Sequence, residues 1–185
     1  MRITGGEAKG KLIHIQKGSL VRPTADRVRE SFFNIISAIA GKSFLDIFAG
    51  SGIVGLEALS RGATNVVFIE KDSRIADALK DNIKKMGFAS KAEVIAAPAM
   101  KALEILLSRG KRFDIIFADP PYNKGMVGEV LGFINPEELM AEDAVFIIQH
   151  STKEVIGELK TDSVLLTDQR KYGDTVLSFF RWCRS

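Results

Sequence analysis

From residue 43 onward, short apolar runs alternate with amphipathic stretches, and this order restricts the possible folds more than any other feature of the chain. The apolar runs have the length of buried strands, and the stretches between them carry apolar residues at helical spacing. Gly62, Gly87 and Gly110 are placed to end three of the helices. Repeated strand and helix units of this kind fold as a parallel sheet with helices on both faces. The expected strands are 43–48, 65–70, 92–96, 113–118 and 144–149, and the expected helices are 53–61, 73–86, 98–108 and 125–134.

The last part of the chain breaks this alternation. Two runs with strand character, V-L-L-T-D-Q-R-K-Y and T-V-L-S-F-F-R-W, are separated only by Gly173 and Asp174, so we expect an antiparallel hairpin. We therefore predict an α/β fold with a mostly parallel, Rossmann-like sheet of seven strands and an antiparallel C-terminal hairpin strand. This arrangement is typical of class I S-adenosylmethionine-dependent methyltransferases, whereas dehydrogenase-type Rossmann domains usually lack the hairpin.

The chain has 185 residues, close to the size of one domain, so we expect a single domain over 1–185. Residues 1–22 alternate apolar and polar side chains around glycines, which predicts a small β-hairpin extension that must dock on something larger. Residues 23–185 would form the Rossmann-like core, which begins with a helix over 26–40.

Composition excludes several classes of protein. Apolar residues make up 46% of the chain and charged residues 26%, and no stretch approaches the roughly 20 consecutive apolar residues of a membrane span. The N-terminus does not read as a secretory signal. Cys183 is the single cysteine and lies far from His14 and His150 in the sequence, so we expect neither a disulfide nor a metal site. We expect a protein that is neither exported nor in contact with a membrane, and no motif indicates an obligate protein partner.

Basic residues are concentrated at the N-terminus. Residues 1–30 contain seven Lys or Arg against three acids, a net charge of +4, whereas the whole chain carries +3. Such a segment suits contact with nucleic-acid phosphates, because each neutralised phosphate releases counterions. A solvated basic face without a partner is the alternative.

The first expected strand runs into D-I-F-A-G-S-G-I-V-G, in which Gly50, Gly52 and Gly55 have the dinucleotide-binding spacing. A tight turn alone would also favour such glycines. Glu70 ends the next strand, where a carboxylate can accept hydrogen bonds from both ribose hydroxyls of an adenosine-containing ligand. Asp46 favours S-adenosylmethionine over a pyrophosphate compound, because its carboxylate can hold the cationic amino group of the methionine part. The alternative for Asp46 is a hydrogen bond to the glycine loop itself.

The strongest chemical motif is D-P-P-Y, residues 119–122, which follows the fourth strand. The carboxyl ends of the strands form the ligand crevice in such a sheet, so we expect this motif beside the glycine loop. The Asp119 carboxylate and the Pro120 carbonyl can accept the two N–H bonds of an exocyclic base amine and orient its delocalised lone pair. Pro121 helps to keep that carbonyl in an extended conformation, and Tyr122 offers a ring on which a flipped base can stack. The alternative is a Pro-Pro pair that only ends a strand.

The chain resembles the RsmD family, bacterial methyltransferases that modify the 2-amino group of a guanine in small-subunit ribosomal RNA. The resemblance covers nearly the whole length and rests on M-R-I-T-G-G, V-R-P-T-A-D-R-V-R-E-S-F-F-N-I, L-D-I-F-A-G-S-G-I-V-G-L-E-A-L-S-R-G-A, F-I-E-K-D, D-P-P-Y and Y-G-D-T. D-P-P-Y is shared with adenine DNA methyltransferases, so R-P-T-A-D-R-V-R-E is the specific part. The resemblance implies a cytoplasmic enzyme that uses S-adenosyl-L-methionine, releases S-adenosyl-L-homocysteine and acts on the small ribosomal subunit or its RNA.

The resemblance also implies roles for individual residues. The catalytic group would be Asp119, Pro120 and Tyr122, and RNA would contact Arg22, Arg27, Arg29 and Pro121. The cofactor would be bound by Asp46, Phe48, Ala49, Gly50, Ser51, Gly52, Glu70, Lys71, Ala97 and Thr24. Pro98 stands where relatives commonly have an acid near the adenine amino group. Adenine recognition must then depend on backbone groups near Ala97, and we expect weaker cofactor binding without loss of activity.

Three other functions are compatible with parts of the sequence. An NAD-type oxidoreductase would share the glycine spacing, but D-P-P-Y and the basic N-terminus would have no explanation. A nucleic-acid-binding module without catalysis would not need Asp119 and Tyr122. DNA adenine-N6 methylation is the alternative within the enzyme class, because guanine as the substrate follows from the family resemblance and not from the chemistry of the residues.

Overall fold

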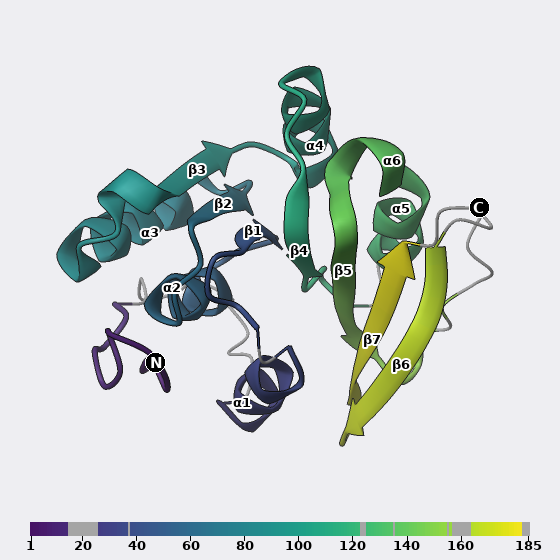
Figure 1. The fold of residues 1–185 in the computed structure, drawn as a ribbon, viewed down its shortest axis with the longest axis horizontal. Coiled ribbons are helices and arrows are strands. Elements are labelled where there is room, and N and C mark those ends of the chain that lie inside the picture. The colour runs from purple at the N-terminus through teal and green to yellow at the C-terminus, as the bar shows by residue number, and fades with distance from the viewer. Residues whose placement is uncertain are drawn as a thin grey trace. The chain divides into compact units, whose positions relative to one another are not determined.

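The computed structural model describes residues 1–14, 26–36, 38–122, 125–134, 136–154, 156 and 164–182. The chain forms two compact units, Met1–Ala99 and Met100–Ser185. Figure 1 follows the helices and strands of both units in chain order. Each unit is built on its own group of adjacent strands.

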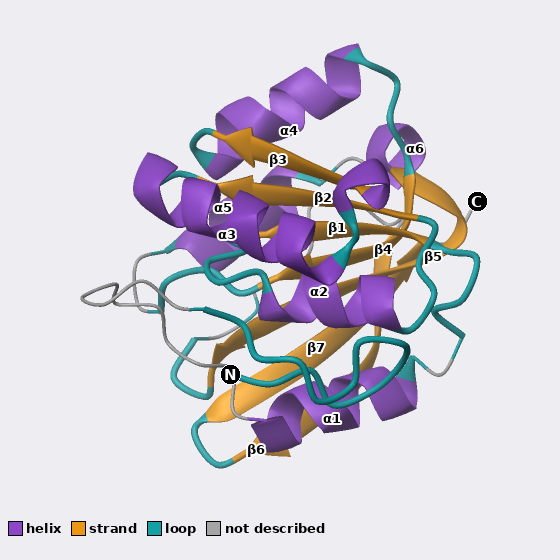
Figure 2. Ribbon diagram, turned by 90° about the vertical axis from the view of Figure 1, so that its left-hand side faces the viewer, coloured by secondary structure: helices purple, strands orange, loops and turns teal. Residues whose placement is uncertain are grey.

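The first unit contains three parallel strands in the order β3-β2-β1. Ile47 pairs with Ile69, and Glu70 pairs with Ala96, so the three carboxyl ends lie at one edge. Helices α2 and α3 pack against these strands (Figure 2). The elements of this unit are α1 (Asp26–Ile35), β1 (Ser43–Ile47), α2 (Ile53–Ser60), β2 (Asn65–Glu70), α3 (Ser73–Met86), the 3-10 helix η1 (Ala89–Lys91) and β3 (Ala92–Ala96).

Burial of apolar side chains explains why these segments form. In β1 and β2 every residue after the first is buried, as expected for parallel strands that are covered on both faces. All eight residues of α2 are buried as well. Phe32 of α1 packs edge-on against Phe44 of β1, with 6.4 Å between the ring centroids. The core of the first unit is therefore shared by α1, α2 and the strands.

The second unit has four strands in the order β4-β5-β7-β6. β4 and β5 are parallel, and β7 runs antiparallel to both β5 and β6. Phe146 of β5 stacks on Phe180 of β7, with 5.7 Å between the ring centroids. Besides α4 (Ala99–Ser108), which starts at the boundary between the units, the elements are β4 (Phe113–Ala118), α5 (Met126–Phe133), α6 (Pro136–Leu139), β5 (Met140–Ser151), β6 (Val164–Tyr172) and β7 (Thr175–Trp182).

The predicted run of parallel strands and helices and the antiparallel C-terminal hairpin are confirmed. The helix predicted over 26–40 is too long, because α1 ends at Ile35. Ile39 is buried as its spacing suggested, but it lies in a turn in which the Lys42 N–H donates to its carbonyl. The spacing of apolar residues predicted correctly that Ile39 is buried, but it did not show that the helix ends before this residue. That residues 1–185 form one domain stays a prediction.

The fifth strand is longer than predicted, and a short helix before it was missed. β5 spans Met140–Ser151 instead of 144–149 because Met140 also pairs with Phe113 of β4. The pairing shifts register between Phe113 and Ile115, and Asp143 has a left-handed φ of 60°. The strand therefore contains an irregularity near residues 142 and 143. Because both residues are polar, the apolar run used to predict the strand began only after them.

The described part of the N-terminal extension folds back on itself. Arg2 and Leu12 form an antiparallel bridge, and the Ile3 N–H donates to the Lys11 carbonyl at 3.0 Å. The predicted hairpin is thus reduced to one isolated bridge in this part. Residues 15–22 lie outside the described residues.

Gly55 is expected to be required for the packing of α2. A Cβ at this position would lie 2.3 Å from the Phe68 ring and 2.9 Å from Val66. Overpacking of a dense core typically costs about 1–3 kcal/mol, so Gly55→Ala should lower the free energy of unfolding by that amount. Urea unfolding followed by circular dichroism measures it. Gly128→Ala in α5, where a Cβ would meet nothing within 4 Å, is the control and should be neutral or stabilising. Equal stability of both variants would contradict the expectation.

Candidate functional site

The chain turns sharply between β1 and α2. Phe48 has a φ of 64°, in the left-handed region that bulky residues rarely adopt, and Gly50 and Gly52 have φ of 55° and 76°. The Ala49 N–H donates to the Ile69 carbonyl at 2.8 Å and ties this loop to β2. Backbone strain at a residue other than glycine is concentrated at functional sites, so the loop is a candidate ligand-binding site.

Two buried carboxylates organise this loop. Asp46 is 2% exposed, and its Oδ2 accepts a hydrogen bond from the Gly55 N–H at 3.0 Å. Glu70 is 9% exposed; its Oε2 accepts from the Gly50 N–H at 2.9 Å and its Oε1 from the Asp72 N–H at 2.8 Å. The hydrogen bond considered as the alternative role for Asp46 is therefore present. The same two groups concentrate negative charge at the strand edge, where a cation or ribose hydroxyls could bind.

The predicted cofactor residues of the first unit follow the carboxyl ends of its strands. Residues 48–52 form the turn after β1, Glu70 and the exposed Lys71 follow β2, and Ala97 follows β3. The Ala97 N–H donates to the Ile95 carbonyl at 3.1 Å, and proline has no N–H. Ala97 and Pro98 therefore present no uncommitted backbone donor to an adenine ring. Thr24 lies outside the described residues.

The D-P-P-Y motif follows β4 in the second unit. Pro120 is buried, whereas Asp119, Pro121 and Tyr122 are partly exposed. Gln149 donates from Nε2 to the Tyr122 hydroxyl at 3.3 Å, and the Thr175 hydroxyl lies 3.4 Å from it. Neither contact was predicted. A glutamine at the end of the apolar run A-V-F-I-I-Q was the signal available in the sequence.

The arginines predicted to contact RNA differ in their setting. Arg27 is exposed on α1, as a phosphate contact requires. Arg29 is 1% exposed; its Nε donates to Glu57 Oε2 at 2.9 Å and its Nη2 to the Arg2 carbonyl at 2.9 Å. The prediction that Arg29 contacts RNA is wrong in this structure, because a guanidinium enclosed by its own chain does not reach a phosphate. Arg22 lies outside the described residues.

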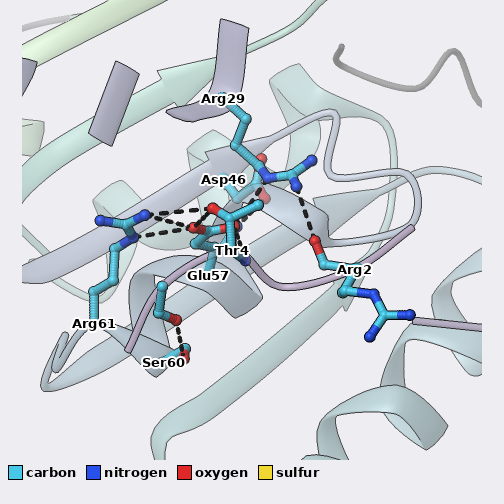
Figure 3. A network of polar contacts seen from close by, with 9 residues as sticks. Arg2, Thr4, Arg29, Asp46, Glu57, Ser60 and Arg61 are labelled. Atoms are coloured by element: carbon cyan, nitrogen blue, oxygen red, sulfur yellow. Dashed lines mark hydrogen bonds and ion pairs between the residues drawn. The ribbon is translucent and has the colours of Figure 1, made fainter. Parts of the chain in front are cut away.

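Glu57 of α2 is the centre of the polar network shown in Figure 3. Its carboxylate is fully buried and accepts hydrogen bonds from Arg29, from the Thr4 hydroxyl and from the Thr4 N–H at 3.2 Å. Arg61 Nη2 lies 2.7 Å from Glu57 Oε1, and its guanidinium also covers the Phe33 ring at 4.7 Å. The network joins the N-terminal segment, α1 and α2 within the first unit.

The N-terminal glycines allow this close approach to α2. Gly6 has a φ of 77°, and a Cβ there would lie 1.8 Å from the Ser60 carbonyl oxygen. The Glu7 N–H donates to that oxygen at 2.8 Å, and the Ser60 hydroxyl donates to the Gly5 carbonyl at 2.6 Å. M-R-I-T-G-G and L-E-A-L-S-R-G are therefore two sides of one internal interface, which sequence reasoning did not detect.

Burial by itself raises the pKa of Glu57, but the hydrogen bonds from Thr4, Arg61 and Arg29 outweigh it and hold the pKa below its ordinary value. The carboxylate is therefore charged at neutral pH. A lowered pKa in the folded state stabilises the fold above the ordinary value, and this contribution is lost as the pH falls through the lowered pKa.

Two kinds of feature are absent from the described ranges. No helix in them is long and apolar enough to cross a bilayer. Within the same ranges, no group of three or more His, Cys, Asp or Glu side chains could hold a metal ion.

Comparisons with known proteins place the chain. Residues 1–181 match the model of a family described as Conserved hypothetical protein 95. The chain is 35% identical over 150 residues to Ribosomal RNA small subunit methyltransferase D of Escherichia coli K12, a match that covers 80% of this chain and 74% of that protein. It is 34% identical over 182 residues to a Bacillus subtilis protein named "Putative rRNA methyltransferase YlbH", with 98% of each covered. The chain belongs to the RsmD family.

This RsmD-family chain is also similar to a solved structure. The Escherichia coli protein named "Putative methyltransferase yhhF" matches with a TM-score of 0.85 and 30% identity, over 98% of this chain and 97% of that one. The predicted class I methyltransferase fold is thereby confirmed.

Removal of the Glu57 charge should destabilise this RsmD-family protein and change its response to acid. Glu57→Gln leaves the buried Arg29 without its counter-charge, which typically costs about 3–5 kcal/mol. The wild type should lose stability steeply as the pH falls below about 4.5, and the variant should lose less over the same range. Thermal unfolding between neutral and acidic pH measures both effects.

Asp77→Asn is the matched control, because its ion pair with Lys80 is exposed and worth under about 1 kcal/mol. An unchanged acid profile in Glu57→Gln would contradict the assignment.

Proposed function

We propose that this chain transfers a methyl group from S-adenosyl-L-methionine to the exocyclic 2-amino group of a guanine in small-subunit ribosomal RNA. The observation that carries the proposal is the Asp119–Tyr122 motif after β4, in a chain 35% identical to an enzyme named Ribosomal RNA small subunit methyltransferase D. Guanine as the target base is inferred from the family. The motif contributes groups that can accept hydrogen bonds from an exocyclic amine.

The first unit offers groups that fit this cofactor. The loop after β1 contains the left-handed Phe48 and several glycines, and the carboxylates of Asp46 and Glu70 lie beside it. Its backbone and these two charges would contact an adenosine-containing ligand. Asp46 would bind the methionine ammonium and Glu70 the ribose hydroxyls. The cofactor contacts would be completed by Phe48, Ala49, Gly50, Ser51, Gly52, Lys71, Ala97 and Thr24. When bound, the cofactor would supply an electrophilic methyl group and leave as S-adenosyl-L-homocysteine.

The D-P-P-Y residues would hold the base. The Asp119 carboxylate and the Pro120 carbonyl accept the two amine N–H bonds, which turns the nitrogen lone pair toward the methyl group. The nitrogen gains a carbon substituent and loses one proton, which Asp119 accepts or passes to water. Tyr122 stacks on the base, and Pro121 lines the same loop.

The RNA partner would be held electrostatically. The exposed Arg27 and the sequence neighbour Arg22 suit phosphate contact, and the assembled or assembling small ribosomal subunit in the cytoplasm would supply the substrate.

Asp119 provides the test of the chemical step. Asp119→Ala should lower kcat by about 100-fold or more, because an acceptor that acts on the developing charge is lost. Affinity for S-adenosylmethionine, measured by calorimetry, should stay within about twofold, because the interaction is made in the transition state. Glu138→Ala on an exposed turn of α6 is the control and should keep wild-type kcat. Retained turnover in Asp119→Ala would remove the residue from the mechanism.

The substrate is tested by offering labelled S-adenosylmethionine with unmodified small subunits, naked ribosomal RNA and DNA in parallel. Nucleoside chromatography should show label as N2-methylguanosine from the subunits or their RNA. Label in DNA adenine would move the chain to the DNA methyltransferases. Cofactor binding without transfer to any acceptor would favour a non-catalytic module.

Salt dependence tests the phosphate contact. Arg27→Ala should reduce the slope of log affinity against log salt for RNA by about one, because one phosphate contact is lost. Lys84→Ala, an exposed lysine at the end of α3, is the control and should leave the slope unchanged. An unchanged slope in Arg27→Ala would assign the residue no role in RNA binding.

A further inference from the structure

Gln149 is a buried polar residue of β5 in the second unit, 3% exposed. It pairs with Leu177 of β7, and two residues further on Ser151 pairs with Thr175. Paired residues point to the same face of a sheet and alternate along a strand, so Gln149 and Thr175 share one face as diagonal neighbours. Thr175 is the last residue of the Y-G-D-T motif.

The Tyr122 hydroxyl contacts both of these side chains. Gln149 Nε2 donates to it at 3.3 Å, and the Thr175 hydroxyl lies 3.4 Å from it. The backbone of Tyr122 follows two prolines, whose φ angles are restricted. The prolines thus restrict the backbone that precedes the ring, and β5 and β7 contact its hydroxyl.

The Gln149 side chain is only partly satisfied by hydrogen bonds. Within the described residues, Gln149 Oε1 is buried and has no hydrogen-bond partner. A buried acceptor without a partner destabilises the folded state, and an apolar side chain of similar length would avoid that cost. A polar side chain placed here at a cost in stability is consistent with a functional role.

We propose that Gln149 and Thr175 are positioning residues that fix the ring of Tyr122 as the platform on which the target guanine stacks. The inference rests on the proposed function and adds a role for the Y-G-D-T motif and the end of β5. Neither residue touches the base. They act through the Tyr122 hydroxyl, and a ring free to tilt would present the amine at the wrong distance from the methyl group.

A double-mutant cycle tests whether Gln149 acts through Tyr122. Gln149→Met and Tyr122→Phe should each lower kcat on unmodified small subunits about tenfold, with little change in the KM for S-adenosylmethionine. The double variant should be no slower than the slower single variant, because both changes break one contact. The melting temperature of Gln149→Met should be unchanged or higher, since it removes the unpartnered acceptor.

Gln169→Met is the matched control. Gln169 lies exposed on β6 and donates to the Ser178 hydroxyl at 2.8 Å, so its replacement should leave kcat unchanged. Multiplicative losses in the double variant, or wild-type kcat in Gln149→Met, would overturn the proposal.

A measurement without turnover separates this inference from the proposed function. The chain has two tyrosines, Tyr122 and Tyr172, so ring-labelled tyrosine gives two sets of nuclear magnetic resonance signals. Gln149→Met should shift or broaden the Tyr122 ring signals and leave those of Tyr172 in place. Unchanged Tyr122 signals would overturn the inference even if the wild type methylates RNA. Shifted signals in a protein that methylates no acceptor would support the positioning and count against the proposed function.

Discussion

The first unit depends on one buried carboxylate. Glu57 accepts hydrogen bonds from the N-terminal segment through Thr4, from α1 through Arg29 and from Arg61, which directly follows α2. The Arg29 and Glu57 side chains are both fully buried, so either charge alone would be costly, and their ion pair offsets that cost. Because these segments are far apart in the chain, the charge that they enclose determines where the N-terminus and α1 lie.

The glycine loop follows the same principle on a smaller scale. Asp46 and Glu70 hold the N–H groups of Gly55 and Gly50, so the loop keeps its shape through hydrogen bonds to neighbouring strands. In the proposed reaction these carboxylates also bind the cofactor, which combines a structural and a functional role. Their position at the carboxyl ends of β1 and β2 permits both, since the loop and a ligand meet at that edge.

The second unit carries polar contacts within its sheet. β5 and β7 bury polar side chains on both faces: His150 contacts Ser178 at 2.8 Å on one, and Gln149 reaches the Tyr122 hydroxyl on the other. If packing were the only requirement, these buried positions of β5 and β7 would carry apolar residues. The C-terminal hairpin also contacts the D-P-P-Y motif, because the Thr175 hydroxyl of β7 lies 3.4 Å from the Tyr122 hydroxyl.

The sequence by itself determined the order of strands and helices and the strands after which the glycine loop and the D-P-P-Y motif follow. These features depend on the periodicity of apolar residues, on turn residues and on prolines, all of which act over a few neighbouring positions. The sequence did not determine where α1 ends, that Arg29 is buried, or that Gln149 contacts Tyr122. An arginine in a basic segment has the same local sequence whether it faces solvent or a buried acid such as Glu57. Only the tertiary structure decides between them, because the partner is brought close by packing and not by sequence.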